Sequence, residues 1–161
     1  MKRFLIATVV AVGLILGLTV APAQAQAGHF IERGAGAPVC TDIGTQVTCT
    51  GKVAGLGGTT FTITVEAPGI ASVVCINPGG QRAPGQDTAV TVSGTTGPLP
   101  TPRNGQFVFS ITTDDPEPLP PTPTCPNEMW TPEIVDVAFT TATLSLFEDG
   151  NLSDQVVVPV S

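Results

Sequence analysis

The stretch Thr60-Phe61-Thr62-Ile63-Thr64-Val65 alternates threonine with large apolar residues. Successive side chains of a β-strand point to opposite faces, so this pattern predicts a strand with Phe61, Ile63 and Val65 on its inner face. Threonine and β-branched residues are also enriched in strands. The fold must then supply a second layer to cover this apolar row, as two packed β-sheets do.

Similar apolar rows recur along the chain, separated by Gly, Pro or Asn. The rows predicted to face inward are Val73 and Cys75; Val90 and Val92; Phe107, Phe109 and Ile111; Val135, Val137 and Phe139; Leu144 and Leu146; and Val156, Val158 and Val160. Together with a strand that begins at Val47, they make about eight short strands. Their spacing predicts an all-β fold, an immunoglobulin-like or related Greek-key β-sandwich rather than a closed barrel.

The beginning of the chain is typical of a secretory signal peptide. Lys2 and Arg3 precede an apolar run over residues 4–20, and two Ala-Gln-Ala triplets end at Ala25 and Ala27. An uncleaved membrane anchor is the less favoured alternative, because this run is at the lower length limit for crossing a bilayer. We therefore expect a secreted, extracellular protein with a signal peptide at 1–27, an extended N-terminal segment at 28–39 and one disulfide-stapled domain at 40–161.

The charge of the chain excludes two classes of partner. All thirteen acidic residues follow Ala27, but only four of the six basic residues do, so this part has a formal charge of −9. Nucleic acids and anionic membranes are bound by positively charged surfaces. We therefore expect no nucleic-acid partner, and no membrane contact once the signal peptide is removed.

Four cysteines, Cys40, Cys49, Cys75 and Cys125, form an even set in a chain that we expect to be exported. Such a set predicts two disulfides, for which three pairings exist. We favour Cys40 with Cys49, because the Asp-x-Gly sequence between them suits a hairpin turn, and Cys75 with Cys125 then follows by elimination. The cysteines lack the CxxC spacing and the histidines of zinc or redox sites, so structural bridges are favoured.

Two long loops, 77–86 and 114–124, are rich in Gly or Pro and adjoin the second cysteine pair, so that disulfide would hold them near one end of the sandwich. The candidate interaction residues here are Asn77, Arg82 and Trp130. Trp130 would stack on a sugar or receive a partner side chain; alternatively, it caps the core beside the disulfide.

The second of these loops holds the densest group of acidic residues, Asp114, Asp115 and Glu117. Carboxylate oxygens suit Ca²⁺, but the intervening prolines limit how far these side chains converge. The group is therefore only a weak Ca²⁺ candidate, and we expect no other metal and no cofactor.

The sequence does not indicate an enzyme. The single histidine, His29, lies next to the predicted cleavage site, where it is poorly placed to act as a base. The chain contains no Gly-x-Ser-x-Gly elbow, zinc motif or phosphate-binding loop. We therefore expect no catalytic residues.

Several turn and cysteine motifs resemble those of a group of small exported bacterial proteins of uncharacterised function. The motifs are Cys75-Ile76-Asn77-Pro78-Gly79-Gly80, Ala83-Pro84-Gly85-Gln86, Asn104-Gly105, and Cys125-Pro126-Asn127 with the stretch to Trp130. The resemblance implies an exported β domain with two disulfides. It implies no catalytic or ligand-binding residue.

These observations favour a non-enzymatic exported structural or interaction module that acts at the cell surface or in the extracellular matrix. Its partner would be an extracellular protein or a second copy, for example through pairing of segment 28–39 or strand 155–160 with an open sheet edge of a neighbour. The first alternative is a soluble extracellular binder, either of a small apolar ligand between the sheets or of a protease as its inhibitor. The second is a carbohydrate-binding accessory domain, which requires an exposed Trp130.

Overall fold

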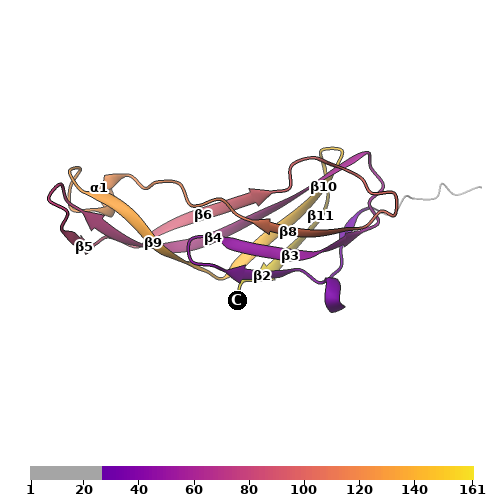
Figure 1. The fold of residues 1–161 in the computed structure, drawn as a ribbon, viewed down its shortest axis with the longest axis horizontal. Helices are drawn as coiled ribbons and strands as arrows, with labels where there is room; N and C mark the ends of the chain where they lie inside the picture. Colours follow the sequence, from indigo (N-terminus) through magenta and orange to yellow (C-terminus); the bar gives the residue numbers. More distant parts are fainter. Residues whose placement is uncertain (1–26) are drawn as a thin grey trace, which may run out of the picture.

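The computed structural model describes residues 27–161, and the predicted signal peptide, apart from Ala27, lies outside the described residues. The described chain is all-β, with two antiparallel sheets that pack face to face (Figure 1). The predicted β-sandwich is therefore confirmed. Eleven strands are present in this part of the chain, and three of them have only two or three residues, so eight longer strands remain. This number equals the predicted one only because β2, which was not predicted, is present and β4 replaces two predicted strands.

The smaller sheet is built around β3 (Val47–Ala54). On one side β3 pairs with β8 (Phe107–Thr112), and on the other side it pairs with β2 (Val39–Asp42) and then β1 (His29–Phe30). A single 3-10 turn, η1 (Gly34–Gly36), connects β1 to β2. The segment 28–39, which we expected to be an extended lead into the domain, thus contributes β1 to the smaller sheet.

The larger sheet is built around β4 (Thr60–Ile76), which has 17 residues. One flank of β4 pairs first with β10 (Thr141–Glu148) and then with β9 (Thr131–Phe139), and β11 (Asn151–Pro159) pairs with the outer side of β10. The other flank pairs in turn with β7 (Leu99–Pro100), β6 (Thr88–Thr95) and β5 (Arg82–Pro84). A short helical turn, α1 (Pro121–Thr124), lies between β8 and β9.

A proline explains why β9 and β10 are separate strands. The sequence predicted two strands, one at Phe61 to Val65 and one near Val73, but β4 continues through Pro68 and Gly69. Proline has no N–H to donate to a neighbouring strand. The pairing with β10 stops at Glu66 and that with β9 begins at Gly69, so Ala67 and Pro68 have no partner on this flank. Pro68 therefore divides the neighbouring strand and leaves β4 intact.

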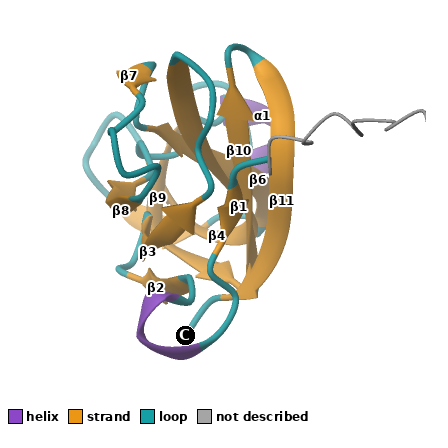
Figure 2. Cartoon of the chain, turned by 90° about the vertical axis from the view of Figure 1, so that its right-hand side faces the viewer, coloured by secondary structure: helices purple, strands orange, loops and turns teal. Residues whose placement is uncertain are grey.

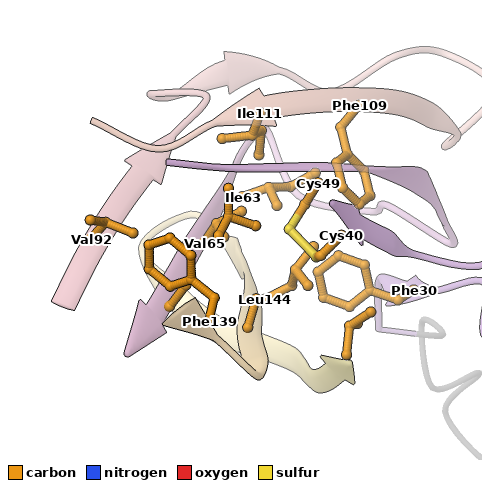
Figure 3. Packing of buried hydrophobic residues seen from close by; sticks show 14 of the residues in the cluster. Phe30, Cys40, Cys49, Ile63, Val65, Val92, Phe109, Ile111, Phe139 and Leu144 are labelled. Carbon is orange, nitrogen blue, oxygen red and sulfur yellow. A yellow bond between two sulfur atoms is a disulfide. The ribbon is translucent and has the colours of Figure 1, made fainter. Parts of the chain in front are cut away.

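The inward-facing rows of both sheets form one core (Figure 3). Phe61, Ile63 and Val65 are at most 1% exposed, as their alternation with threonine predicted. The ring centroids of Phe30 and Phe109 are 5.8 Å apart in an edge-to-face arrangement, a geometry that adds about 0.5–1.5 kcal/mol to the burial of the rings. Between the sheets, the ring of Phe61 in β4 meets that of Phe107 in β8, with centroids 5.0 Å apart, so the core joins the two sheets.

The prediction that Val135 points inward is wrong. Its side chain is 47% exposed, and Ile134 is packed against the core instead. Ser72 pairs with Asp136, but the next residue, Val73, pairs with Ile134, so Val135 is the extra residue of a β-bulge. A bulge shifts the inside–outside alternation by one position, and the apolar pattern of the sequence does not reveal it.

The last strand joins the two sheets at one edge. Cys40 forms a parallel bridge with Val160, and the Ser161 N–H donates to the Cys40 carbonyl at 3.1 Å. Nearby, the Phe30 N–H donates to Asp154 Oδ2 at 2.8 Å, and Figure 2 shows β1 between β3 and β11. Segment 28–39 and strand 155–160 thus both make contacts within the chain, and β11 is the outer strand of the larger sheet.

Both disulfides have the favoured pairing. Cys40 and Cys49 are opposite each other in β2 and β3, and both are fully buried. Cys75, in β4, is linked to Cys125, which follows α1. The first bridge spans a sequence separation of 9 residues and the second a separation of 50 residues.

This difference predicts unequal contributions to stability. Replacing both Cys75 and Cys125 by alanine should lower the free energy of unfolding by about 4 kcal/mol, and replacing Cys40 and Cys49 by about 2.7 kcal/mol, because a longer loop restricts the unfolded chain more. Urea unfolding of the two double variants measures both losses. A greater loss for the Cys40 and Cys49 variant would contradict this prediction.

Candidate functional site

Most of the interaction residues predicted from the sequence lie at one end of the sandwich. We call this the stapled end and define it as residues 72–87 together with residues 114–135. The Cys75–Cys125 disulfide joins its two parts, and the Gln86 N–H donates to the Thr124 carbonyl at 2.9 Å. Figure 1 shows α1 and β5 at this end. The two long loops are therefore held together, as expected.

Asn77 has a role within its own turn. Its Oδ1 accepts hydrogen bonds from the N–H groups of Gly79 and Gln81, both at 2.9 Å. Its Nδ2 donates to Gln81 Oε1 at 2.9 Å. Asparagine commonly organises turns by such contacts with the following backbone. Its polar atoms hold the turn at 77–81, so Asn77 is a poor candidate for contact with a partner.

Arg82 is accessible. Its Nη2 lies 3.0 Å from Glu133 Oε2, and the two side chains are 55% and 48% exposed. This ion pair links β5 to β9 across the outer face of β4, and it is the one ion pair found within residues 27–161. Exposed pairs contribute at most about 1 kcal/mol to stability. The guanidinium therefore remains available at the rim of this face.

Trp130 immediately precedes β9 and is half-buried. Trp130 does not belong to the buried core. Its neighbour Met129 is 71% exposed. The large apolar side chains that are strongly exposed within residues 27–161 include no aromatic residue. Trp130 therefore has no exposed aromatic companion with which to form a flat sugar-binding platform.

The acidic residues of the second loop do not form a ligand set. Asp115 Oδ1 accepts a hydrogen bond from Thr45 Oγ1 at 2.8 Å, and the backbone N–H of Asp114 donates to the Ser93 carbonyl at 2.8 Å. In the part of the chain that the structure describes, no three His, Cys, Asp or Glu side chains come together as metal ligands would. Asp114, Asp115 and Glu117 thus do not converge on a Ca²⁺ position.

The outer face of β4 carries two neighbouring hollows, which we call the β4 surface. The first has a volume of about 390 Å³ and is lined by Pro68, Gly69, Ile70, Ala89, Val90, Thr91, Ala138 and Thr140. The second has a volume of about 400 Å³ and is lined by Ser72, Val73, Val74, Arg82, Ala83, Pro84, Gly85, Asp87 and Val135. The first contains no charged residue, and the second contains only Arg82 and Asp87.

The centre of the β4 surface is apolar. Ile70 is 49% exposed and lies between Ala89 of β6 and Ala138 of β9, its partners on the two neighbouring strands. The small side chains on both sides leave Ile70 prominent. The bulge adds a second exposed apolar residue, Val135, to the same face.

Two carboxylates at the other end of β4 were missed by the sequence analysis. Glu148 Oε1 accepts hydrogen bonds from the N–H groups of Gly57 and Gly58 at 2.7 and 3.2 Å. Asp149 Oδ1 accepts from the N–H groups of Thr59 and Thr60 at 3.0 and 2.9 Å. We call these two residues the carboxylate clamp, because together they hold the loop that leads into β4.

The clamp favours ionised carboxylates. Burial raises the pKa of the Glu148 carboxyl, but hydrogen bonds from Gly57, Ser153, Gly28 and Gly58 outweigh this effect, and its pKa lies below the ordinary 4.5. Hydrogen bonds from the Thr60 and Thr59 N–H groups lower the pKa of Asp149 below 3.8. A carboxylate with a lowered folded-state pKa stabilises the fold above its unfolded-state pKa, and this contribution is lost as the pH falls through the folded-state value.

The lowered pKa of Asp149 predicts how the substitution Asp149→Asn changes the pH dependence of stability. Asparagine tolerates the positive φ of 47° at this turn position, so the substitution removes the charge and keeps the turn. The free energy of unfolding of the native chain should fall more steeply than that of the variant as the pH is lowered from 5 to 2. Urea unfolding across this range measures both slopes. Identical slopes would show that the clamp does not couple protonation to stability.

Comparisons with known proteins identify no family. No family model matches the chain, and no curated protein matches it. Among solved structures, a candidate beta-galactosidase from Bacteroides fragilis aligns with a TM-score of 0.35 and 15% sequence identity, over 82% of this chain and 17% of that chain. The chain thus spans less than a fifth of that protein.

Within residues 27–161, no helix has the length and apolar character needed to cross a bilayer. A small all-β domain with two disulfides is confirmed, and the bacterial group suggested by the sequence motifs is not.

Proposed function

We propose that this chain is a non-enzymatic extracellular interaction module that binds a protein partner through the β4 surface. The observation that carries this proposal is the uncharged hollow around Ile70, in a chain whose net charge is −7. Exposed apolar patches with a polar rim are typical of protein contact sites.

The two disulfides support an extracellular location. Both bridges are formed, and the described residues contain no free cysteine. Disulfides persist in oxidising compartments and are rare in the cytosol. Secretion by means of the signal peptide at 1–27 is part of the proposal.

The geometry of the β4 surface suits recognition. β4 is paired on both flanks for most of its length, and the Cys75–Cys125 disulfide restrains the loops at its end. A surface that is already ordered loses less conformational entropy on binding than a mobile loop does. Ile70 would be the central apolar contact, and Arg82 and Asp87 would provide charged contacts at the rim.

The alternative functions have less support. A small apolar ligand between the sheets would have to displace the side chains of the core in Figure 3, where Phe30 and Phe109 already pack together. A carbohydrate-binding role lacks a group of exposed aromatic residues within 27–161. For a protease inhibitor, the loop around Cys125 offers a disulfide, but Thr124 and Cys125 are themselves buried.

The proposal predicts a different effect for two matched substitutions. Ile70→Lys places a charge on the β4 surface, and Val108→Lys places one on the outer face of the smaller sheet, where Val108 is 71% exposed. Ile70→Lys should weaken the complex with the partner at least tenfold, because a central apolar contact is lost and a charge must be desolvated. Val108→Lys should leave the complex intact.

The measurement is the native mass of the exported protein in its culture medium, by size-exclusion chromatography with light scattering, combined with crosslinking to locate the contact. Thermal unfolding of both variants controls for loss of the fold. Disruption by Val108→Lys alone would place the interface on the smaller sheet. A monomer in every sample, without crosslinks to another chain, would overturn the proposed function.

A further inference from the structure

Gly28, the second described residue, is buried and closely surrounded. Its N–H donates to Glu148 Oε2 at 2.8 Å, and its carbonyl oxygen lies 2.9 Å from Ser153 Oγ. A Cβ at position 28 would lie 2.9 Å from Glu148 Oε2 and 2.9 Å from Leu56 Cδ2, so a larger residue would displace the ends of these two side chains. Residues from the loop at 55–59, β10 and β11 thus enclose the Gly28 backbone.

Within residues 27–161, the side chains that accept hydrogen bonds from the Gly28 and Phe30 N–H groups are carboxylates, and neither of them is paired with Lys or Arg. Besides Gly28, Glu148 accepts hydrogen bonds from two neutral backbone N–H groups and lies 2.7 Å from the Ser153 hydroxyl. Asp154 also accepts a hydrogen bond from a backbone N–H, that of Phe30. The one ion pair found in the described part of the chain joins Arg82 to Glu133 on other strands. A charged donor in place of one of these neutral N–H groups would form a stronger hydrogen bond with the carboxylate.

The predicted cleavage sites determine whether the Gly28 nitrogen carries a positive charge. Two Ala-Gln-Ala triplets precede the domain, and the second ends at Ala27, directly before Gly28. Cleavage after Ala27 would convert the Gly28 N–H into an α-ammonium group, 2.8 Å from Glu148 Oε2. Cleavage after Ala25 would leave Gln26 and Ala27 attached and the Gly28 nitrogen a neutral amide. The two products therefore differ in charge at the atom that contacts Glu148.

We propose that the chain is processed between Ala27 and Gly28, and that the new α-ammonium of Gly28 forms an ion pair with Glu148 that fixes the N-terminus to the folded domain. The processing step is a hydrolysis by an endopeptidase that recognises small residues. The bond between the Ala27 carbonyl carbon and the Gly28 nitrogen breaks, water supplies the hydroxyl of the new Ala27 carboxyl and a hydrogen of the Gly28 amine, and the amine then takes up a proton from solvent.

The ion pair would stabilise the processed chain relative to its precursor. A hydrogen bond from a charged donor to a carboxylate is about twice as strong as one between neutral groups. Glu148 on β10 is the titratable group in contact with the Gly28 nitrogen. Nearby, Asp154 on β11 accepts a hydrogen bond from the Phe30 N–H, and His29 Nδ1 lies 3.3 Å from the Ala27 carbonyl oxygen. Glu148 and Asp154 are acidic, and a neighbouring carboxylate favours the charged form of an amine.

The first test is the mass of the exported chain. Intact-mass spectrometry, with sequencing of the N-terminal peptide, should give a chain that begins at Gly28. A chain that begins at Gln26 would overturn the proposed processing site. This result does not depend on any partner of the β4 surface, so it is separate from the test of the proposed function.

The second test is a double-mutant cycle on the ion pair. Oxidised chains that begin at Gly28 or at Gln26 are prepared with Glu148 or with Glu148→Gln, and their urea unfolding is compared at pH 7. With Glu148, the chain that begins at Gly28 should have an unfolding equilibrium constant about tenfold lower than the longer chain. With Glu148→Gln, this difference should fall below about twofold, because the charged acceptor is gone. Equal stability of all four chains, or a difference that survives Glu148→Gln, would overturn the ion pair.

Two further measurements keep the test decisive if Glu148→Gln does not fold. Acetylation of the Gly28 amine removes its charge and retains Glu148, so the acetylated chain should lose the same tenfold advantage. Raising the pH to 10.5 deprotonates an α-amino group, whose ordinary pKa is about 7.7–8.0, and should also remove the advantage. An advantage that persists after acetylation or at pH 10.5 would contradict an ion pair.

Discussion

The structure depends on one uninterrupted strand, β4, whose two faces have different roles. Its inward residues, from Phe61 to Cys75, are buried apart from Gly69 and form one wall of the core. Its outward residues Pro68, Ile70, Ser72 and Val74 form the β4 surface. Because side chains of a strand alternate between faces, the register that buries the first set also exposes the second. A change of register in β4 would therefore destroy the core and the proposed binding surface together.

Much of the fold could be predicted from the alternation of apolar and polar residues, because this alternation indicates which face of a strand is buried. The row Phe61, Ile63, Val65 and the pair Leu144, Leu146 are buried as their spacing indicates. The exceptions arise from pairing between distant segments. The bulge that turns Val135 outward is defined by its neighbour β4, and the effect of Pro68 is on the strand beside it. The apolar periodicity of a single segment predicts neither the bulge nor the division of the neighbouring strand.

The candidate sites were harder to predict for the same reason. Asn77 and Arg82 were singled out by residue type and loop position, but the structure shows that Asn77 is occupied by its own turn. The β4 surface depends on Ile70 lying between Ala89 and Ala138, which are distant in sequence. The carboxylate clamp likewise joins Glu148 and Asp149 to a loop about 90 residues earlier. A glycine-rich loop whose N–H groups need acceptors was the one signal for the clamp in the sequence.

The distribution of charge also bears on the kind of partner that the β4 surface would bind. After Ala27 the chain carries thirteen acidic and four basic residues, so two copies repel one another at low salt. The β4 surface is flanked by the outward-facing Glu66 and Asp136, and a symmetric contact through Ile70 would bring these like charges of two copies together. Like charges placed opposite each other across an interface weaken binding. A partner with an apolar centre and basic side chains around it fits this surface better than a second copy of the chain.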